Sequence, residues 1–203
     1  MDFFLISFIS YLMGSIPFGF ILTKFFLKQD IRNIGSGNIG ATNALRTGNK
    51  LIGYSTLILD VAKAIIPVIY VKNNYPDLIY LASLSAFLGH VFPIWLKFKG
   101  GKGVATYLGI LFSINLVYGF IFISNWLFIF FLSKYSSLSS LIAAFSIPVY
   151  LYVSGNTNGI SFFLIMFVLI IYTHREMLND WKIERKQGQK FINLTIKVFW
   201  VVC

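Results

Sequence analysis

Long apolar stretches alternate with short polar connections along the chain of 203 residues. Because an apolar helix of about 20 residues crosses a lipid bilayer, the pattern predicts an all-α, polytopic integral membrane protein with seven transmembrane helices. The stretches that we expect to cross are Phe3–Thr23, Leu51–Val71, Leu78–Leu96, 103–113, 116–133, Leu138–Val153 and Ile160–Tyr172.

Two places in this pattern need interpretation. The first stretch contains Gly14-Ser-Ile-Pro-Phe-Gly19, where a proline among small residues predicts a break whose backbone groups neighbouring elements must satisfy. The run from Val104 to Leu132 is too long for one ordinary crossing. We divide it at Ser113–Asn115, its most polar interior point.

Composition excludes an ordinary soluble domain, because 57% of the residues are apolar and only 12% are charged. The net charge of +10 lies mostly in the connections and the tail, so we expect membrane lipids and no nucleic acid as its partner. Cys203 is the only cysteine, which excludes an internal disulfide and a cysteine-based metal site. Met1–Phe4 lacks the basic region of a signal peptide, so we expect the first helix to be retained.

The basic residues predict the orientation in the membrane. With seven crossings, fifteen of the seventeen basic residues fall on one side, in residues 24–50, in residues 97–102, at Lys134 and in the tail. Positive connections favour the cytoplasm, so we expect the N-terminus outside and the C-terminus in the cytoplasm. The expected organisation is one membrane domain, 1–203, with cytoplasmic loops 24–50 and 97–103 and a cytoplasmic tail 173–203.

The first cytoplasmic loop contains Gly35-Ser-Gly-Asn-Ile-Gly40, which matches G-x-G-x-x-G in letters only. A dinucleotide-binding motif requires a preceding strand and a βαβ unit, whereas membrane helices flank this loop. Its side-chain and backbone donors suit an anionic, hydroxyl-bearing small molecule. An ordinary surface turn is the alternative, but such turns seldom combine so many donors and glycines. The candidate residues are Ser36, Gly37, Asn38, Thr42, Asn43 and Arg46.

The second loop, Lys97-Phe-Lys-Gly-Gly-Lys-Gly103, is not a Walker A motif, because Leu96 and Gly103 stand where that motif needs glycine and Ser/Thr. Its glycines, Lys102 and the start of a helix at Val104 still suit a phosphate. A positive-inside anchor would explain the other lysines but leaves the glycines unexplained. We therefore expect Lys102, Gly100, Gly101 and Gly103 to bind phosphate.

Few other side chains suggest chemistry. We expect His174, at the end of the last helix, to contact substrate or transfer a proton, and His90 to pack or form hydrogen bonds above Pro93. Asp60 and Lys63, three residues apart within a membrane helix, are expected to neutralise each other as a structural strut near the site. Two distant histidines and few carboxylates predict no metal site and no cofactor.

These clusters, in this order, resemble the bacterial acyl-phosphate:glycerol-3-phosphate acyltransferase family over nearly the whole chain. The matching segments are Gly14–Gly19, Ser36–Asn43 with Arg46, Gly89-His90 through Gly100–Thr106, and Thr173-His-Arg-Glu176. The resemblance implies a seven-helix enzyme of the bacterial inner membrane whose active site faces the cytoplasm. It implies transfer of a fatty acyl group from acyl phosphate to the 1-hydroxyl of glycerol 3-phosphate, giving lysophosphatidic acid and phosphate in phospholipid synthesis.

Carried over by position, the resemblance assigns roles to four residues. Ser36 and Arg46 would contact glycerol 3-phosphate, Lys102 with its glycines would bind phosphate, and His174 would line the reaction centre. The enzyme that makes acyl phosphate is a further candidate partner.

One position departs from the family pattern, which has Asn three residues after the histidine where this chain has Met177. Met offers no strong donor or acceptor, so either Asn179 replaces the missing amide or activity is weakened. Two other interpretations stay open, the second of them because of Met177. One is a transporter of a phosphorylated solute, although no internal repeat supports it, and the other is a degenerate, non-catalytic homologue.

Overall fold

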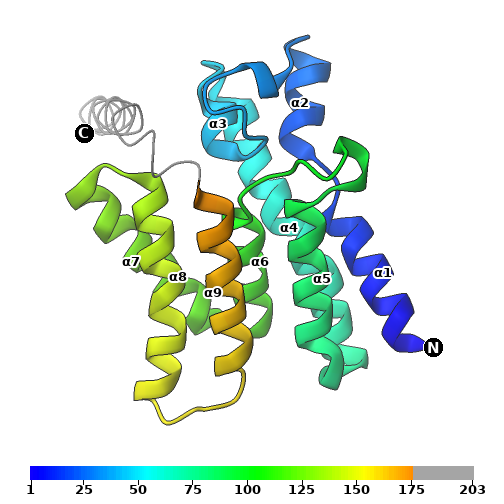
Figure 1. The fold of residues 1–203 in the computed structure, drawn as a ribbon, viewed down its shortest axis with the longest axis vertical. Coiled ribbons are helices and arrows are strands. Elements are labelled where there is room, and N and C mark those ends of the chain that lie inside the picture. The colour runs from blue at the N-terminus through cyan, green and yellow to red at the C-terminus, as the bar shows by residue number, and fades with distance from the viewer. Residues whose placement is uncertain (176–203) are drawn as a thin grey trace. The chain divides into compact units, whose positions relative to one another are not determined.

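The computed structural model describes residues 1–175, and every regular element in that part of the chain is a helix (Figure 1). The predicted tail beyond Arg175, with Met177 and Asn179, lies outside the described residues. The α-helices are α1 Asp2–Gly14, α2 Phe18–Phe26, α3 Ala41–Leu45, α4 Lys50–Asn74, α5 Ile79–Val91, α6 Val104–Ile114, α7 Leu116–Ser133, α8 Ser136–Val153 and α9 Ile160–His174. Short 3₁₀ turns are η1 Ile31–Asn33, η2 Pro76–Leu78 and η3 Ile94–Leu96.

Five segments of the described chain are long and apolar enough to cross a membrane. They are Asp2–Phe26, Lys50–Asn74, Pro76–Leu96, Leu116–Ser133 and Ser136–Val153. Helices α6 and α9 are apolar but shorter, with 11 and 15 residues. The chain is therefore a multi-pass helical membrane protein, while seven crossings and their orientation remain predictions.

The first predicted crossing is two helices, α1 and α2, separated by Ser15–Pro17. Pro17 has no N–H to donate to the preceding turn, so the helical ladder stops there. The break is closed locally by a hydrogen bond from the Phe18 N–H to the Ile16 carbonyl, 3.1 Å. The break predicted from the small residues and the proline is confirmed.

The predicted division of the long apolar run is also confirmed. Asn115 adopts extended backbone, with φ −155° and ψ 129°, between α6 and α7. Its side-chain oxygen accepts a hydrogen bond from the Val117 N–H at 2.9 Å, which caps the start of α7. A polar residue therefore ends one helix and begins the next.

The described chain divides into two compact units, Met1–Gly119 and a second that begins at Phe120. In the first unit α1 packs along α5 and α4 packs along α6, so that α4 is shared by most of its neighbours. In the second unit α8 packs against α9, and Ala144 and Ile147 of α8 and Met166 of α9 are buried. Many large apolar side chains, such as Phe4 and Phe128, are exposed, as helices surrounded by lipid tails require.

Small residues let α1 and α5 approach closely near the α1–α2 break. Gly14 lies against the backbone of Ala86, and a Cβ added to Gly14 would overlap the Ala86 carbonyl. The Tyr11 hydroxyl also donates to the Phe92 carbonyl at 2.6 Å. Close backbone approach between helices is a common source of stability where lipid weakens the hydrophobic drive. The end of α1 is thereby held against the end of α5.

We predict that Gly14→Ala destabilises the protein, because the new methyl group meets backbone that cannot move aside independently. Overpacking of this kind costs about 1–3 kcal/mol, so thermal unfolding in detergent should shift to lower temperature. Ile9→Phe is the control, since it adds volume on α1 at a side chain that is 46% exposed. Equal unfolding temperatures for Gly14→Ala and the wild type would contradict the close contact.

Candidate functional site

Asn43 organises the loop between α2 and α4. Its side chain is 2% exposed, and its amide nitrogen lies 2.7, 2.9 and 3.1 Å from the carbonyl oxygens of Asn38, Ile34 and Ile31. Its amide oxygen accepts from the Ser36 N–H at 3.1 Å. One buried side chain therefore satisfies backbone groups that the loop itself would leave unpaired.

The same amide orients the two residues expected to meet glycerol 3-phosphate. Arg46 donates to the Asn43 oxygen from Nη1 at 3.4 Å, and Ser36 is bound to that oxygen through its backbone. Ser36 is exposed and Arg46 is half-buried. A hydroxyl and a guanidinium thus share one anchor at the rim of the loop, an arrangement that suits a small anion bearing a hydroxyl.

The other candidates in this loop take different positions. Thr42 is exposed on α3, and the Asn38 side chain accepts from the Gly40 N–H at 2.9 Å. Gly37 closes a turn by donating its N–H to the Ile34 carbonyl at 2.9 Å. These positions leave Thr42 the most accessible of the three.

Asp30 and Arg32 begin the loop. Asp30 caps η1 by accepting from the Arg32 N–H at 3.0 Å, and its carboxylate is paired with the Arg32 guanidinium at 2.6 Å. The hydrogen bond from Arg32 lowers the pKa of Asp30 to about 2. The folded carboxyl therefore stays ionised, and any stability it adds is present above pH 4 and lost as the pH falls towards 2. Because the pair is exposed, that contribution is small.

A buried apolar cluster joins this loop to the lysine- and glycine-containing loop. Leu96, directly before Lys97, packs in the same cluster as residues from η1, α3 and α4. Partly buried side chains of α2 cover the cluster from one side. The buried members are Ile31, Ile39, Ala44, Ile52 and Leu96. The two polar loops predicted from the sequence therefore lie together in the first unit.

The Lys97–Gly103 loop folds back on the end of α5. The Gly100 N–H donates to the Val91 carbonyl and the Gly101 N–H donates to the His90 carbonyl, each at 3.0 Å. These two N–H groups are therefore engaged by α5. While these hydrogen bonds are intact, Gly100 and Gly101 can shape the loop but do not offer their N–H groups to a phosphate. The binding roles predicted for them stay predictions.

Gly103 starts α6. Its φ of +85° lies in the left-handed region that favours glycine, and the Phe87 ring occupies the space where a side chain would lie. No side chain caps this helix start, so the first N–H groups of α6 have no partner within the helix. Half-buried Lys102 precedes them. A lysine beside an uncapped helix start has the chemistry of a phosphate site.

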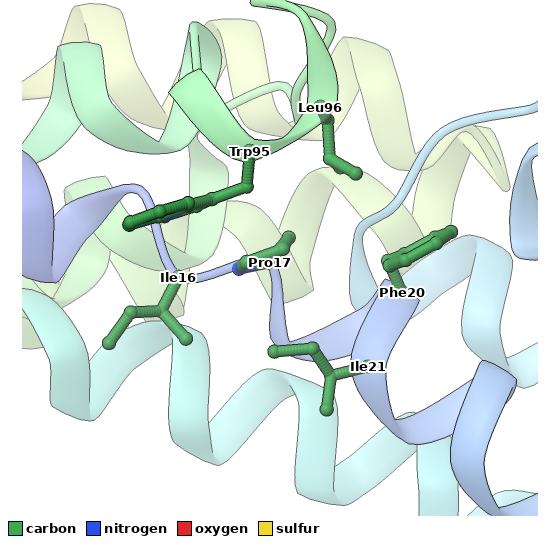
Figure 2. Close-up of a pocket in the computed structure, with 6 residues that line it drawn as sticks. All are labelled: Ile16, Pro17, Phe20, Ile21, Trp95 and Leu96. Carbon is green, nitrogen blue, oxygen red and sulfur yellow. The ribbon is translucent and has the colours of Figure 1, made fainter.

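An apolar groove borders the α1–α2 break. It has a volume of about 290 Å³ and is lined by Ile16, Pro17, Phe20, Ile21, Trp95 and Leu96. Figure 2 shows the Trp95 indole lying over Ile16 and Pro17, with Phe20 and Ile21 on the neighbouring turn of α2. The groove suits hydrocarbon rather than a charged group, and Leu96 belongs both to it and to the cluster under the two loops.

His174 belongs to the second unit, as the last residue of α9. Its ring is 3% exposed, and Nδ1 lies 2.8 Å from the Ile170 carbonyl, which can only accept. Nδ1 is therefore the donor in this contact. The predicted contact of His174 with substrate stays a prediction.

Within residues 1–175, no three His, Cys, Asp or Glu side chains gather closely enough to hold an ion. The site consists instead of backbone donors, hydroxyls and cations.

A family model described as glycerol-3-phosphate acyltransferase matches residues 4–182. A glycerol-3-phosphate acyltransferase from Pelagibacter ubique is 66% identical over 190 residues, which cover 94% of this chain and 98% of that protein. One from Bradyrhizobium diazoefficiens is 48% identical over 171 residues, covering 83% and 85%. This chain belongs to the glycerol-3-phosphate acyltransferase family. The family predicted from the sequence is confirmed.

Two solved structures resemble this acyltransferase. Both are crystal structures of PlsY (YgiH), described as an integral membrane glycerol 3-phosphate acyltransferase, one in a glycerol 3-phosphate form and one in a lysophosphatidic acid form. Their TM-scores are 0.84 and 0.82 at 36% and 35% identity, and each match covers 91% of this chain and 94% of the solved chain. The acyltransferase thus shares its fold with an integral membrane relative.

Sequence reasoning missed the positioning role of some residues in this site. Asn43 was grouped with the substrate-binding donors, yet its amide is engaged by the loop's own backbone. Leu96 appeared only as the end of an apolar run, and no sequence signal marked its contact with the Ser36–Arg46 loop. The number of carbonyls around Asn43 depends on loop geometry, which residue types alone do not specify.

We predict that Asn43→Ala lowers acyltransferase activity strongly and loosens the loop, because each buried carbonyl left unpaired costs about 1–3 kcal/mol. Hydrogen exchange of amides 31–46 should accelerate. Asn33→Ala is the matched control, an exposed asparagine on η1. Wild-type exchange together with wild-type activity in Asn43→Ala would contradict the organising role.

Proposed function

We propose that this acyltransferase transfers a fatty acyl group from acyl phosphate to the 1-hydroxyl of glycerol 3-phosphate, giving lysophosphatidic acid and phosphate. The observation that carries the proposal is the pairing of two polar loops through Leu96, one presenting Ser36 and Arg46 and the other presenting Lys102 beside the uncapped start of α6. Two anionic substrates require two such places side by side. The glycerol 3-phosphate and lysophosphatidic acid forms of the solved relative support the acceptor and the product.

Each residue has a role that its position supports. Ser36 and Arg46, with Gly37, Asn38 and Thr42 nearby, hold glycerol 3-phosphate, and Asn43 keeps them in place. Lys102 and the first turn of α6, entered through Gly103, hold the phosphate of the donor. Gly100 and Gly101 bring this turn against α5. From the family resemblance we also infer a role for His174 in the reaction.

The chemistry needs no nucleophilic residue of the protein, because acyl phosphate is already activated. The glycerol hydroxyl oxygen forms a bond to the acyl carbon, and the bond from that carbon to the phosphate oxygen breaks. The hydroxyl proton ends on the leaving phosphate, which is released as hydrogen phosphate. Holding the two bound substrates close together in the right orientation lowers the activation barrier considerably. Lys102 and the helix start stabilise the negative charge that grows on the leaving phosphate.

The placement in the membrane follows from the same proposal. We infer seven crossings in one membrane domain of the bacterial inner membrane, with both polar loops on the cytoplasmic face, where glycerol 3-phosphate is available. The acyl tail of the donor reaches the site from the bilayer, and the apolar groove beside Leu96 offers it a surface. The enzyme that makes acyl phosphate is the proposed partner.

We predict that the purified protein in detergent releases phosphate from palmitoyl phosphate only when glycerol 3-phosphate is present. A chelator and the absence of coenzyme A should leave the rate unchanged, because no step requires either. Lysophosphatidic acid should form in equal amount, as measured by mass spectrometry. Folded protein that forms no lysophosphatidic acid, or that instead moves labelled glycerol 3-phosphate into proteoliposomes, would contradict the proposal.

Lys102→Ala should reduce turnover by about a hundredfold or more, the loss typical when one stabilising group is removed from a developing anion. Insertion and thermal stability should stay near wild type, because the residue lies in a loop and is only half-buried. Lys99→Ala, at an exposed position of the same loop, is the matched control. Wild-type turnover in the Lys102 variant would refute its role in binding phosphate.

A further inference from the structure

A buried charged cluster lies within the membrane helices of the first unit. Asp60 and Lys63 on α4 and His90 on α5 are 1%, 3% and 3% exposed. The Lys63 ammonium is 2.8 Å from Asp60 Oδ1, and His90 Nδ1 is 3.8 Å from the same oxygen. Buried ion pairs add little net stability over apolar packing, so stability alone is a weak reason for this cluster.

Lys63 connects the cluster to the α1–α2 break. Its ammonium donates to the Ile16 carbonyl at 2.7 Å and lies 5.8 Å from the centre of the Phe18 ring. Ile16 directly precedes Pro17, and its carbonyl also accepts from the Phe18 N–H at 3.1 Å, a hydrogen bond within the break itself. A backbone carbonyl at membrane depth needs such a partner. Lys63 therefore holds the break against α4.

His90 connects the cluster to the loop before α6. Its carbonyl accepts from the Gly101 N–H, and its ring nitrogen Nε2 occupies the position where a Cβ of Gly101 would lie. Two residues further, Gly103 directly precedes α6, which begins at Val104. A displacement of the His90 ring would therefore move the start of α6 and the Lys102 that precedes it.

We propose that Asp60, Lys63 and His90 are positioning residues that hold the Gly100–Gly103 turn, and with it the donor-phosphate site, at a set place against the α1–α2 break. Asp60 is the shared element, since its Oδ1 faces both the lysine and the histidine. The inference rests on the proposed function for the identity of the ligand. It goes beyond that function in assigning a task to three residues for which the proposed function has none.

The first test uses the fit between Gly101 and His90. Gly101→Ala places a methyl group on the imidazole, and we expect it to raise the KM for palmitoyl phosphate roughly tenfold while the KM for glycerol 3-phosphate stays within about twofold. His90→Ala should raise the donor KM by a similar factor. In the His90→Ala background the Gly101→Ala change should add no further loss, because the ring it meets is gone. Contacting residues show such non-additivity, whereas independent sites do not.

The second test addresses the ion pair. Asp60→Asn with Lys63→Met removes both charges together, which avoids leaving a lone buried charge. We expect a raised donor KM, weaker inhibition by inorganic phosphate, and faster hydrogen exchange at amides 100 and 101. Lys72→Met is the matched control, because Lys72 also lies on α4 and donates to backbone, at the Ser113 and Ile114 carbonyls at the far end of α6.

The outcomes separate the two proposals. Wild-type protein that fails to use palmitoyl phosphate would contradict the proposed donor, while the exchange rates at amides 100 and 101 would still report on positioning. Additive effects of His90→Ala and Gly101→Ala, equal rises in both KM values, or wild-type exchange in the double charge variant would each overturn the positioning role.

Discussion

The structure depends on the satisfaction of backbone carbonyls where a membrane helix is broken. Pro17 ends the helical ladder, and the Ile16 carbonyl is left among apolar surroundings. In lipid such a group costs several kcal/mol if unpaired, and here it accepts both from the Phe18 N–H and from an ammonium of α4. Asp60 in turn neutralises that lysine. The hydrogen bond to this one carbonyl therefore ties the α1–α2 break to α4.

The close approach of neighbouring backbone segments is a second consequence of the lipid environment. Gly14 brings α1 against α5, and Gly101 brings the loop before α6 against the His90 ring. In water, the burial of apolar surface would hold such elements together and would favour larger side chains at the contact points. In a bilayer, van der Waals contact and hydrogen bonds carry more of the association, which favours small residues at contact points. The glycines of the Lys97–Gly103 loop are explained in part by packing, before any phosphate is considered.

The two polar loops show how a site is assembled on this scaffold. Asn43 orders one loop from inside, so that Ser36 and Arg46 reach the surface in a set relation. The carbonyls of α5 order the other, so that α6 begins with uncapped N–H groups beside Lys102. Leu96 joins them through an apolar cluster. Electrostatic stabilisation of reacting anions requires this kind of prior order, because donors that must reorganise during the reaction contribute less.

Much of the fold followed from the sequence. Apolar runs are the main signal of membrane helices, and the proline at position 17 and the polar Asn115 marked the two breaks. The ends of the helices were harder to predict. Helix α5 ends at Val91, short of the predicted Leu96, because Pro93 disfavours helical backbone at Phe92, which has φ −124° and ψ 62°. The run Leu78–Leu96 is mostly apolar on both sides of Pro93, so its hydropathy did not show that change.

The sequence by itself determined the helical membrane class, the family and the two polar loops, because hydropathy, proline and glycine spacing act over a few neighbouring residues. Only the tertiary structure decided which polar groups face inward. Asn43 and Ser36 are both polar residues of one loop, yet one is buried among carbonyls and the other is exposed. Lys63 meets a carbonyl 47 positions earlier in the chain. Such pairings depend on how helices distant in sequence pack together, and residue types alone do not specify that packing.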